Sequence, residues 1–190
     1  MTYSKETNLV VQSALSAVLL MDLSINSKEF IESDFFNSLE TKTINKEVYQ
    51  FYKTGRTGVG NQGAMLMCLY SVLVLPKELL GNKYAKLYKQ INQDIAKIGG
   101  EVLVDSYREH SPNYVKHIRN AIAHAQVRFD ESQPSSKGEE KNIFVTFTDK
   151  KGRKKFEVKF HVKQIPNILL ALLGIHTAYL RNLQKSSSNA

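Results

Sequence analysis

The chain has 190 residues, the size of one globular domain, and 42% of them are hydrophobic, which is ordinary for a protein with an apolar core. Its net charge of +8 is unevenly placed, because residues 1–50 hold only 4 of the 26 basic residues but 7 of the 18 acidic ones. The single cysteine, Cys68, excludes an internal disulfide framework and any zinc site made of several cysteines. The basic remainder of the chain favours a polyanionic partner such as RNA or DNA.

The first half of the sequence predicts helices. Residues 6–23 have the length and apolar content of a core helix, and the acidic residues 27–50 predict one or two shorter helices. Residues 64–75 are apolar nearly all round, which is typical of a helix at the centre of a core, and Pro76 is expected to stop or kink it. The apolar run at 64–75 falls short of the roughly 20 residues that a membrane span needs, and polar residues interrupt the apolar stretch at 9–21, so no membrane segment is predicted.

A glycine-rich stretch, Gly55 to Gly63, precedes the apolar helix and holds four glycines. It lacks the Gly-Lys-Ser/Thr ending of a Walker loop and the strand–helix context of a dinucleotide-binding loop. Two interpretations stay open. The stretch is a flexible loop that leads into a helix, or Arg56 and the free N–H groups at that helix start bind a phosphate.

The second half changes from a helical period to a period of two. Residues 82–98 predict an amphipathic helix that ends at Gly99-Gly100, and residues 101–110 are expected to link it to the next helix. Apolar and polar side chains then alternate in three segments, which predicts strands with a hairpin turn near Gly152. The segments are 127–130, 143–148 and 156–162. The polar residues 131–141 predict a loop, residues 165–183 a long apolar helix, and residues 186–190 a disordered tail.

The stretch with the most chemistry is Ser111 to Gln126. It predicts a helix with Ser111 as its cap and Pro112 at the first helical position. At ~100° per residue its side chains divide into two arcs. The arc expected to face a core holds Tyr114, Val115, Ile118, Ala121, Ile122 and Ala125. The arc expected to form a cationic, histidine-bearing surface holds Lys116, His117, Arg119, Asn120, Ala123 and His124.

The segment from Arg119 through Asn120 to His124 resembles the Arg–polar–x3–His motif of the HEPN superfamily (higher eukaryotes and prokaryotes nucleotide-binding). Gly60 to Gly63 and Leu75 to Glu78 are similar to segments of bacterial and plasmid-borne HEPN proteins. The resemblance implies a mainly α fold, a single antiparallel helical bundle over residues 1–185. A small β-hairpin or sheet, at about 127–162, is expected to be inserted between the motif helix and the C-terminal helix.

The same resemblance implies a metal-independent endoribonuclease with no cofactor and no metal site. RNA carries its own nucleophile, the ribose 2′-OH, so the enzyme needs a proton-transfer group and a fixed positive charge. His124 is expected to be the general acid or base, because imidazole titrates near neutral pH. Arg119 is expected to stabilise the phosphorane, and Asn120 to orient His124 or the phosphate.

Further residues are expected to contact RNA through their charge: His117, Lys116, Arg56, Lys151, Arg153 and Lys154. His117 is also an alternative acid–base partner for His124 within one chain. The expected partners are RNA, a second copy whose motif helix meets the first, and an antitoxin protein if the chain is a toxin or defence effector. The expected location is the cytoplasm. The alternative function is a non-catalytic HEPN-like module that binds RNA, a nucleotide or a protein.

Overall fold

The computed structural model describes residues 5–39, 46–54, 59–108, 110–132 and 142–188. The chain divides into two compact units, one formed by Met1–Ala14 with Leu69–Ala190 and the other by Leu15–Cys68. That a single domain spans residues 1–185 stays a prediction. All the elements that carry the predicted motif belong to the larger unit.

The smaller unit consists of short helices with an aromatic cluster. It contains the C-terminal part of α1 (Lys5–Ile25), α2 (Ser27–Glu32), α3 (Asp34–Leu39), α4 (Lys46–Lys53) and most of α5 (Gln62–Leu69). The buried ring of Phe36 stacks on Tyr49, with ring centroids 5.3 Å apart, and meets Phe30 at 5.2 Å. The described residues of the acidic stretch thus form three short helices where one or two were expected.

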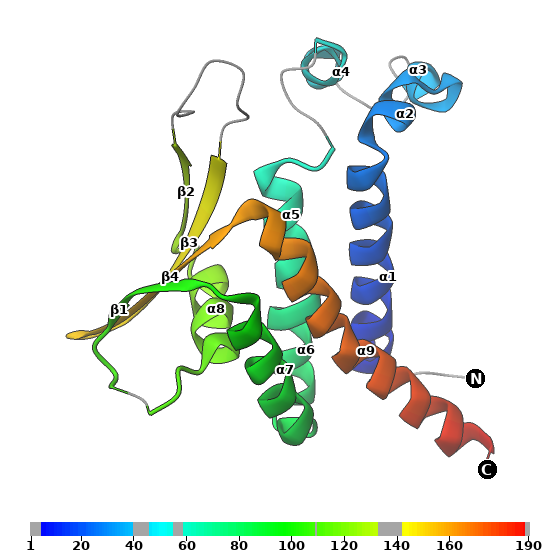
Figure 1. Ribbon diagram of the computed structural model, residues 1–190. Coiled ribbons are helices and arrows are strands. Elements are labelled where there is room, and N and C mark those ends of the chain that lie inside the picture. The colour runs from blue at the N-terminus through cyan, green and yellow to red at the C-terminus, as the bar shows by residue number, and fades with distance from the viewer. Residues whose placement is uncertain (1–4, 40–45, 55–58, 109, 133–141, 189–190) are drawn as a thin grey trace. The chain divides into compact units, whose positions relative to one another are not determined.

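The larger unit combines helices with all four strands of the sheet. After the first part of α1, its elements in chain order are η1 (Tyr70–Val74), α6 (Leu75–Leu80), α7 (Ala85–Ile98), β1 (Glu101–Asp105), α8 (Tyr114–Ala123), β2 (Val127–Ser132), β3 (Asn142–Lys151), β4 (Lys154–His161), η2 (Val162–Gln164) and α9 (Ile165–Ser188). Helices α6, α7 and α8 lie close together beside the sheet (Figure 1). The prediction of a mainly helical protein with a small antiparallel sheet is confirmed.

The apolar stretch before Pro76 changes its hydrogen-bonding period. It begins as α5, passes through the π-helical turns of η1 and continues as α6, in which Pro76 lies in the first turn. Proline has no N–H, and its ring crowds the carbonyl group four residues earlier, so a wider π turn at that point relieves the clash. The helix therefore continues past Pro76 and ends only at Gly81, whose φ of 54° is accessible to glycine.

One described helical segment, Gln62–Leu80, is long and apolar enough to cross a membrane by length and composition alone. It has 19 residues, and 39% of its most apolar window is buried. The interior of a protein selects for the same composition. Its residues Leu69, Val72 and Leu73 have no exposed surface, which fits a core helix.

Four antiparallel strands form one sheet in the order β1-β4-β3-β2. The first strand, β1, lies before the motif helix and pairs along β4, although its residues were expected to be a linker. The hairpin between β3 and β4 turns at Gly152, which has a φ of 59°, and Arg153. Gly100 leads into β1, and a Cβ atom there would lie 2.4 Å from the Phe160 ring. Only glycine fits this close approach of backbone to core.

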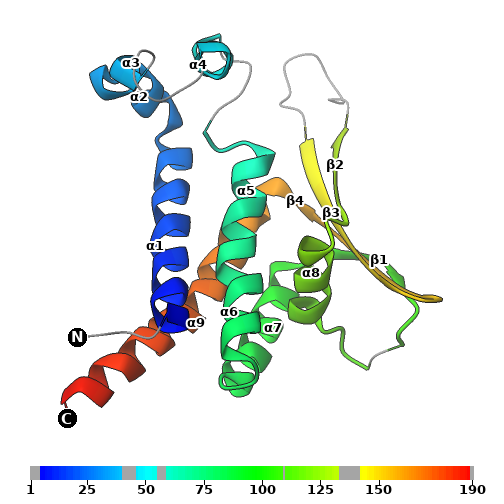
Figure 2. The ribbon, with the colours of Figure 1, turned by 180° about the vertical axis from the view of Figure 1, so that it is seen from behind.

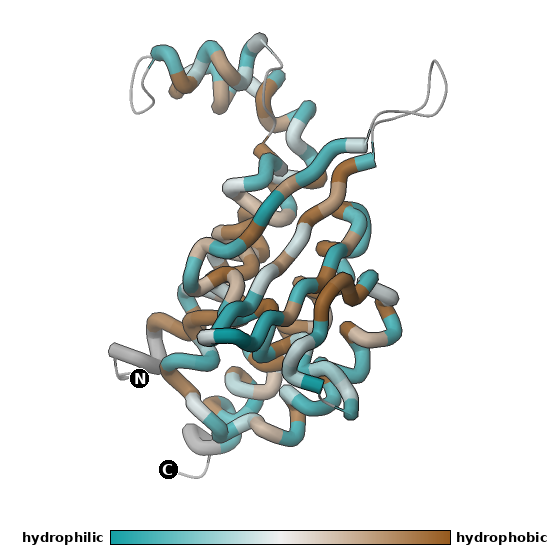
Figure 3. The backbone as a smooth tube through the Cα atoms, turned by 90° about the vertical axis from the view of Figure 1, so that its left-hand side faces the viewer, coloured by the Kyte–Doolittle hydropathy of each residue, from teal (hydrophilic) through white to brown (hydrophobic). Residues whose placement is uncertain are grey.

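The two faces of the sheet differ in character. Val145 and Phe147 on β3, with Phe156, Val158 and Phe160 on β4, are buried on the face that α8 covers. Figure 2 shows α8 lying against this face. The opposite face carries ion pairs, such as Lys159 with Glu101 at 2.7 Å and Lys155 with Glu157 at 2.8 Å. Hydropathy alternates along the strands accordingly, and the hairpin turn is strongly hydrophilic (Figure 3).

Candidate functional site

The motif helix α8 starts at an asparagine cap. The side-chain oxygen of Asn113 accepts a hydrogen bond from the Lys116 N–H at 3.0 Å, which satisfies one of the free donors of the first turn. The helix begins at Tyr114, so the prediction of Ser111 as the cap and Pro112 as the first helical residue is wrong. Asn92 of α7 fixes this start from outside, since it accepts from the Val115 N–H and donates to the Pro112 carbonyl.

The end of α8 is a tight reversal that holds His124. The Gln126 N–H donates to the Ala121 carbonyl at 2.7 Å, and the Ala125 N–H donates to the Ile122 carbonyl at 3.1 Å. These two bonds form a Schellman motif, in which the residue after the cap adopts a left-handed conformation. Ala125 has a φ of 53°, which is costly for a residue with a Cβ atom. The reversal leads directly into β2 and leaves His124 exposed at the helix end.

His117 does not face solvent. Its side chain is 1% exposed and lies between α8 and the sheet, where its ring stacks on Phe156 with centroids 4.2 Å apart. Its Nδ1 atom lies 2.7 Å from Oδ2 of Asp149, a buried carboxylate on β3. The predicted position of His117 on the cationic arc is therefore wrong. A histidine looks polar on a helical wheel, but here the sheet supplies both an aromatic surface and a carboxylate partner.

Arg119 and Asn120 are joined in one hydrogen-bonded chain. An Nη1–H of Arg119 donates to Oδ1 of Asn120 at 2.9 Å, and Nδ2 of Asn120 donates to Oδ2 of Asp149 at 3.1 Å. The other guanidinium nitrogen, Nη2, forms an ion pair with Glu78 of α6. The side chain of Arg119 is only 27% exposed. The guanidinium thus has a fixed orientation before any ligand binds.

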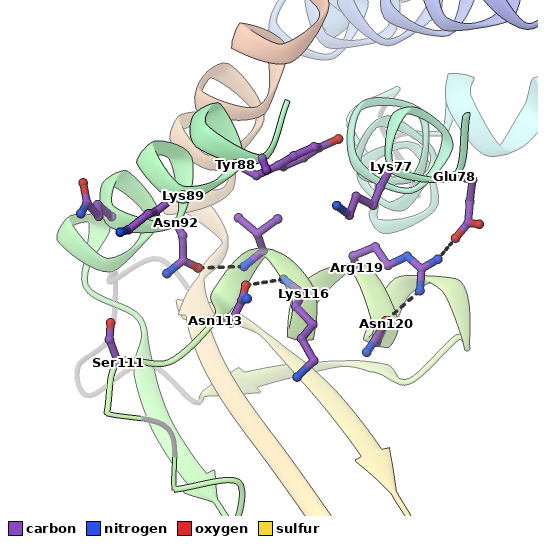
Figure 4. Close-up of a pocket in the computed structure, with 13 residues that line it drawn as sticks. Lys77, Glu78, Tyr88, Lys89, Asn92, Ser111, Asn113, Lys116, Arg119 and Asn120 are labelled. Atoms are coloured by element: carbon purple, nitrogen blue, oxygen red, sulfur yellow. Dashed lines mark hydrogen bonds and ion pairs between the residues drawn. The ribbon is translucent and has the colours of Figure 1, made fainter. Parts of the chain in front are cut away.

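A cavity of about 700 Å³ lies between α6, α7 and α8, with Arg119 on its wall (Figure 4). Its lining side chains are mainly cationic or amide-bearing. They include Lys77, Glu78, Tyr88, Lys89, Lys116, Arg119 and Asn120. Four cations against a single carboxylate give the cavity a positive potential, so it would attract an anion such as a phosphodiester.

Tyr88 contributes an apolar wall and no acid–base chemistry. It is 7% exposed, and burial raises the pKa of its hydroxyl to about 12. The Lys77 ammonium lies 4.7 Å from the centre of the Tyr88 ring and donates to the Gly81 carbonyl at 3.1 Å. Tyr88 therefore stays protonated near neutral pH, and Lys77 is partly engaged in ending α6.

A second basic cluster forms around Tyr107, between β1 and α8. The ammonium groups of Lys116 and Lys154 lie 5.1 and 5.7 Å from the centre of its ring, within cation–π distance. Its ring also contacts His117, with centroids 4.8 Å apart. Lys151 and Arg153 are exposed in the same hairpin as Lys154. The structure thus brings Lys116 of the motif helix close to the hairpin turn.

The predicted site residues fall into separate groups. Arg119 and Asn120 share the cavity wall, whereas His124 does not line the cavity. Among the described residues, no hydrogen bond or ion pair orients the His124 side chain, although its backbone N–H donates to the Asn120 carbonyl at 3.0 Å. Arg56 lies outside the described residues.

Sequence reasoning missed Asp149, Glu78 and Tyr107. Asp149 lies in the predicted hairpin and Glu78 in the segment that resembles HEPN proteins, and neither pattern predicts a site residue. The alternation of β3 was the available signal for Asp149, because it places this carboxylate on the same face as Val145 and Phe147. Within the described ranges, no group of three or more His, Cys, Asp or Glu side chains is arranged to hold a metal ion.

Comparison with known families gives a match over nearly the whole chain. A family model described as HEPN pEK499 p136 matches residues 1–183, a range that includes the motif helix, the sheet and most of α9. No curated protein and no solved structure matches the chain.

Proposed function

The chain belongs to the HEPN pEK499 p136 family, a plasmid-borne branch of the HEPN superfamily, and from this premise we propose that it is a metal-independent endoribonuclease. The family is one of nucleotide-binding or ribonuclease-like modules. The observation that carries the choice of ribonuclease is the fixed guanidinium of Arg119 on a cationic cavity wall, five residues before an exposed histidine.

The proposed reaction uses only side chains and the RNA itself. A base removes the proton of the ribose 2′-OH, the 2′ oxygen forms a bond to phosphorus, and the bond to the 5′ oxygen breaks as that oxygen receives a proton. The products are a 2′,3′-cyclic phosphate and a 5′-hydroxyl. His124 transfers one of these protons, and Arg119 stabilises the charge that develops on the phosphorane oxygens. Asn120 fixes Arg119 in place.

The position of His124 supports a site shared by two copies of the chain. The mechanism needs an acid and a base, and one chain offers one exposed histidine near Arg119, since His117 is buried against the sheet. A homodimer in which two α8 helices meet would bring a second His124 to the site. Mixing the wild type with an excess of His124→Ala protein would then lower activity below the level expected from dilution, because a hybrid dimer holds only one His124 and lacks either the acid or the base.

The proposed RNA surface extends from the cavity to the hairpin. Lys116, Lys151, Arg153 and Lys154 supply cations that bind the phosphate backbone without reading its sequence. Such a nuclease would act in the cytoplasm as a toxin or defence effector, held inactive by an antitoxin protein until needed. His117 has no direct contact with RNA in this proposal.

The second candidate is a non-catalytic module that binds RNA, a nucleotide or a protein. The observation that favours it is the ion pair between Arg119 and Glu78, because a carboxylate already occupies the guanidinium that the reaction requires. In a binding module this pair would close the cavity or tune its charge.

The test is cleavage of a structured RNA in the presence of EDTA by the wild-type protein, His124→Ala and the control His110→Ala, which removes another exposed histidine. We expect the wild type and the control to cut and leave 2′,3′-cyclic phosphate ends. The His124→Ala protein should be slower by about 10²–10⁴-fold. If none of the three cuts and all bind RNA with a steep salt dependence, the binding module replaces the nuclease.

A further inference from the structure

The Asp149 carboxylate lies under the motif helix and accepts two hydrogen bonds on one oxygen. Its side chain is 6% exposed, and Oδ2 contacts both His117 Nδ1 at 2.7 Å and Asn120 Nδ2 at 3.1 Å. A buried carboxylate is tolerated only when it is hydrogen-bonded or paired. An ionised carboxylate oxygen can accept two donors, so His117 and Asn120 together satisfy it.

The neighbours of Asn120 permit one orientation of its amide group. An ionised carboxylate only accepts hydrogen bonds, so the amide must turn its NH₂ toward Asp149. A guanidinium only donates, so the amide must turn its oxygen toward Arg119, where Nη1 lies 2.9 Å away. A rotation of the amide by 180° would place donor against donor and acceptor against acceptor at once.

The fixed amide in turn fixes the guanidinium. Arg119 is held at Nη1 by Asn120 and at Nη2 by Glu78, and its side chain is 27% exposed. The two holding groups differ, because the Glu78 side chain is 54% exposed and can turn away into solvent, whereas Asn120 is anchored to a buried carboxylate. When a phosphate displaces Glu78, the contact with Asn120 is the one that remains.

We propose that Asp149, held in place by His117, is a positioning residue that sets the orientation of Arg119 through the amide of Asn120. The proposal rests on the ribonuclease function proposed above. Asp149 touches no substrate. Its effect is to hold the guanidinium in the geometry that the charged transition state needs, and displacement of a catalytic group by about 1 Å can cost 100-fold in rate. Strand β3 is thereby part of the active site, although the motif lies on α8 and on its C-cap residue His124.

Another carboxylate of the sheet, Glu157, provides a matched control. Glu157 on β4 is also largely buried, with a side chain that is 13% exposed. It accepts from Thr148 at 3.1 Å and pairs with Lys155 at 2.8 Å, on the face away from α8. The hydrogen bond from Lys155 lowers the pKa of Glu157. It differs from Asp149 in having no link to Asn120.

The experiment compares Asp149→Leu, Asp149→Asn and Glu157→Gln with the full-length wild-type protein. We measure kcat and KM for RNA cleavage, the thermal unfolding midpoint, and the NMR signals of the Asn120 side-chain amide, assigned by their loss in Asn120→Ala. We expect Asp149→Leu to lower kcat by about 10- to 100-fold with KM within threefold of wild type. Asp149→Asn, which keeps an acceptor of the same shape, should recover part of this loss, and Glu157→Gln should change neither constant.

The amide signals keep the inference testable even if the wild type is inactive or the Asp149→Leu protein does not fold. If the wild-type protein does not cleave RNA, the proposed function fails, and the positioning inference is decided by the signals alone. A shift of the Asn120 amide signals in Asp149→Asn and not in Glu157→Gln supports it. Unchanged Asn120 signals in Asp149→Asn would overturn it. If the wild type cleaves RNA, a folded Asp149→Leu protein with a kcat within twofold of wild type would also overturn it.

Discussion

The two ends of the motif differ in how firmly the protein holds them. Arg119 is fixed by Asn120 and Glu78, and through Asn120 it is connected to the buried Asp149. His124 lies beyond the last helical residue, exposed, and among the described residues nothing orients its side chain. The protein thus presets the positive charge and leaves the proton-transfer group to be placed by something else. In the proposed reaction, RNA or a second copy of the chain supplies that placement.

This difference matches the demands of the proposed reaction. A guanidinium stabilises charge best when it is already oriented, because no reorganisation is then needed in the transition state. A histidine that transfers protons must approach different oxygen atoms at different stages, which a rigid ring could not do. Each prediction below tests whether one end is fixed and the other is free.

The largest effect is expected from removing either end of the motif. Arg119→Ala and His124→Ala should each lower RNA cleavage by about 100-fold or more. Only Arg119→Ala should also lower the free energy of unfolding, by about 1–3 kcal/mol, because it leaves the Asn120 oxygen without its donor. Cleavage assays and urea unfolding of both proteins measure this. An equal loss of stability in His124→Ala would show that His124 is held as well.

The next effect concerns the basic cluster beside the fixed end. Tyr107→Ala removes the ring shared by Lys116 and Lys154. We expect RNA affinity to fall severalfold and the slope of log affinity against log salt to decrease by about 1–2, as phosphate contacts are lost. Tyr107→Phe keeps the ring and should bind like wild type. Fluorescence titrations at several salt concentrations measure both, and a phenylalanine variant as weak as the alanine variant would contradict the role of the ring.

A buried histidine allows the pH dependence of folding to be separated from that of catalysis. His176 on α9 is 3% exposed, and burial lowers its pKa below 6.5, although the backbone groups of Val72 and Val10 oppose the shift. The unfolded chain therefore binds the proton more tightly than the folded protein. Stability is full above pH 6.5 and falls below it, toward the lowered pKa, by at most about 1.4 kcal/mol per pH unit.

Thermal unfolding of wild type and His176→Phe between pH 7.5 and 5 measures this contribution. The variant should lose less stability on acidification than the wild type does. If the curves of His176→Phe and wild type are parallel, the proton that destabilises the fold binds elsewhere.

The smallest effect is expected at the turn that follows His124. Ala125→Gly removes the Cβ atom at a residue with a φ of 53°, so the free energy of unfolding should rise by about 1 kcal/mol. Because the Schellman hydrogen bonds remain, the position of His124 and the cleavage rate should not change. Calorimetry and a cleavage assay measure the two quantities. A slower enzyme would indicate that the strained turn itself orients His124.

The sequence correctly predicts features that depend on neighbouring residues. It does not predict features that depend on a contact with a residue far away in the chain. The spacing of Ile118, Ala121 and Ile122 correctly predicts the buried side of the motif helix. The position of His117 was wrong, because a helical wheel cannot see the carboxylate that β3 brings beneath it. Strand β1 was missed for the same reason, since its pairing with β4 joins residues more than 50 positions apart.

Local chemistry was also ambiguous where two neighbours compete for one role. Ser111 and Asn113 are both good helix caps, and the sequence does not show that Asn92 of α7 accepts a hydrogen bond from the Val115 N–H in the first turn. That contact places the start of α8 at Tyr114. The sequence shows the spacing of Arg119, Asn120 and His124. It does not show that Arg119 is fixed and His124 is free, because Arg119 is held through Asp149 and Glu78, which lie on other elements.

The Asp149 carboxylate on β3 limits how far this protein can be shortened. A protein engineer seeking a minimal helical scaffold would delete the strands between α8 and α9, since the motif and the cavity both lie on helices. That deletion would remove Asp149, expose the imidazole of His117 and release the amide of Asn120. A shortened helical core would keep every residue of the motif and still lose the alignment of its arginine, so the sheet must be retained in any such design.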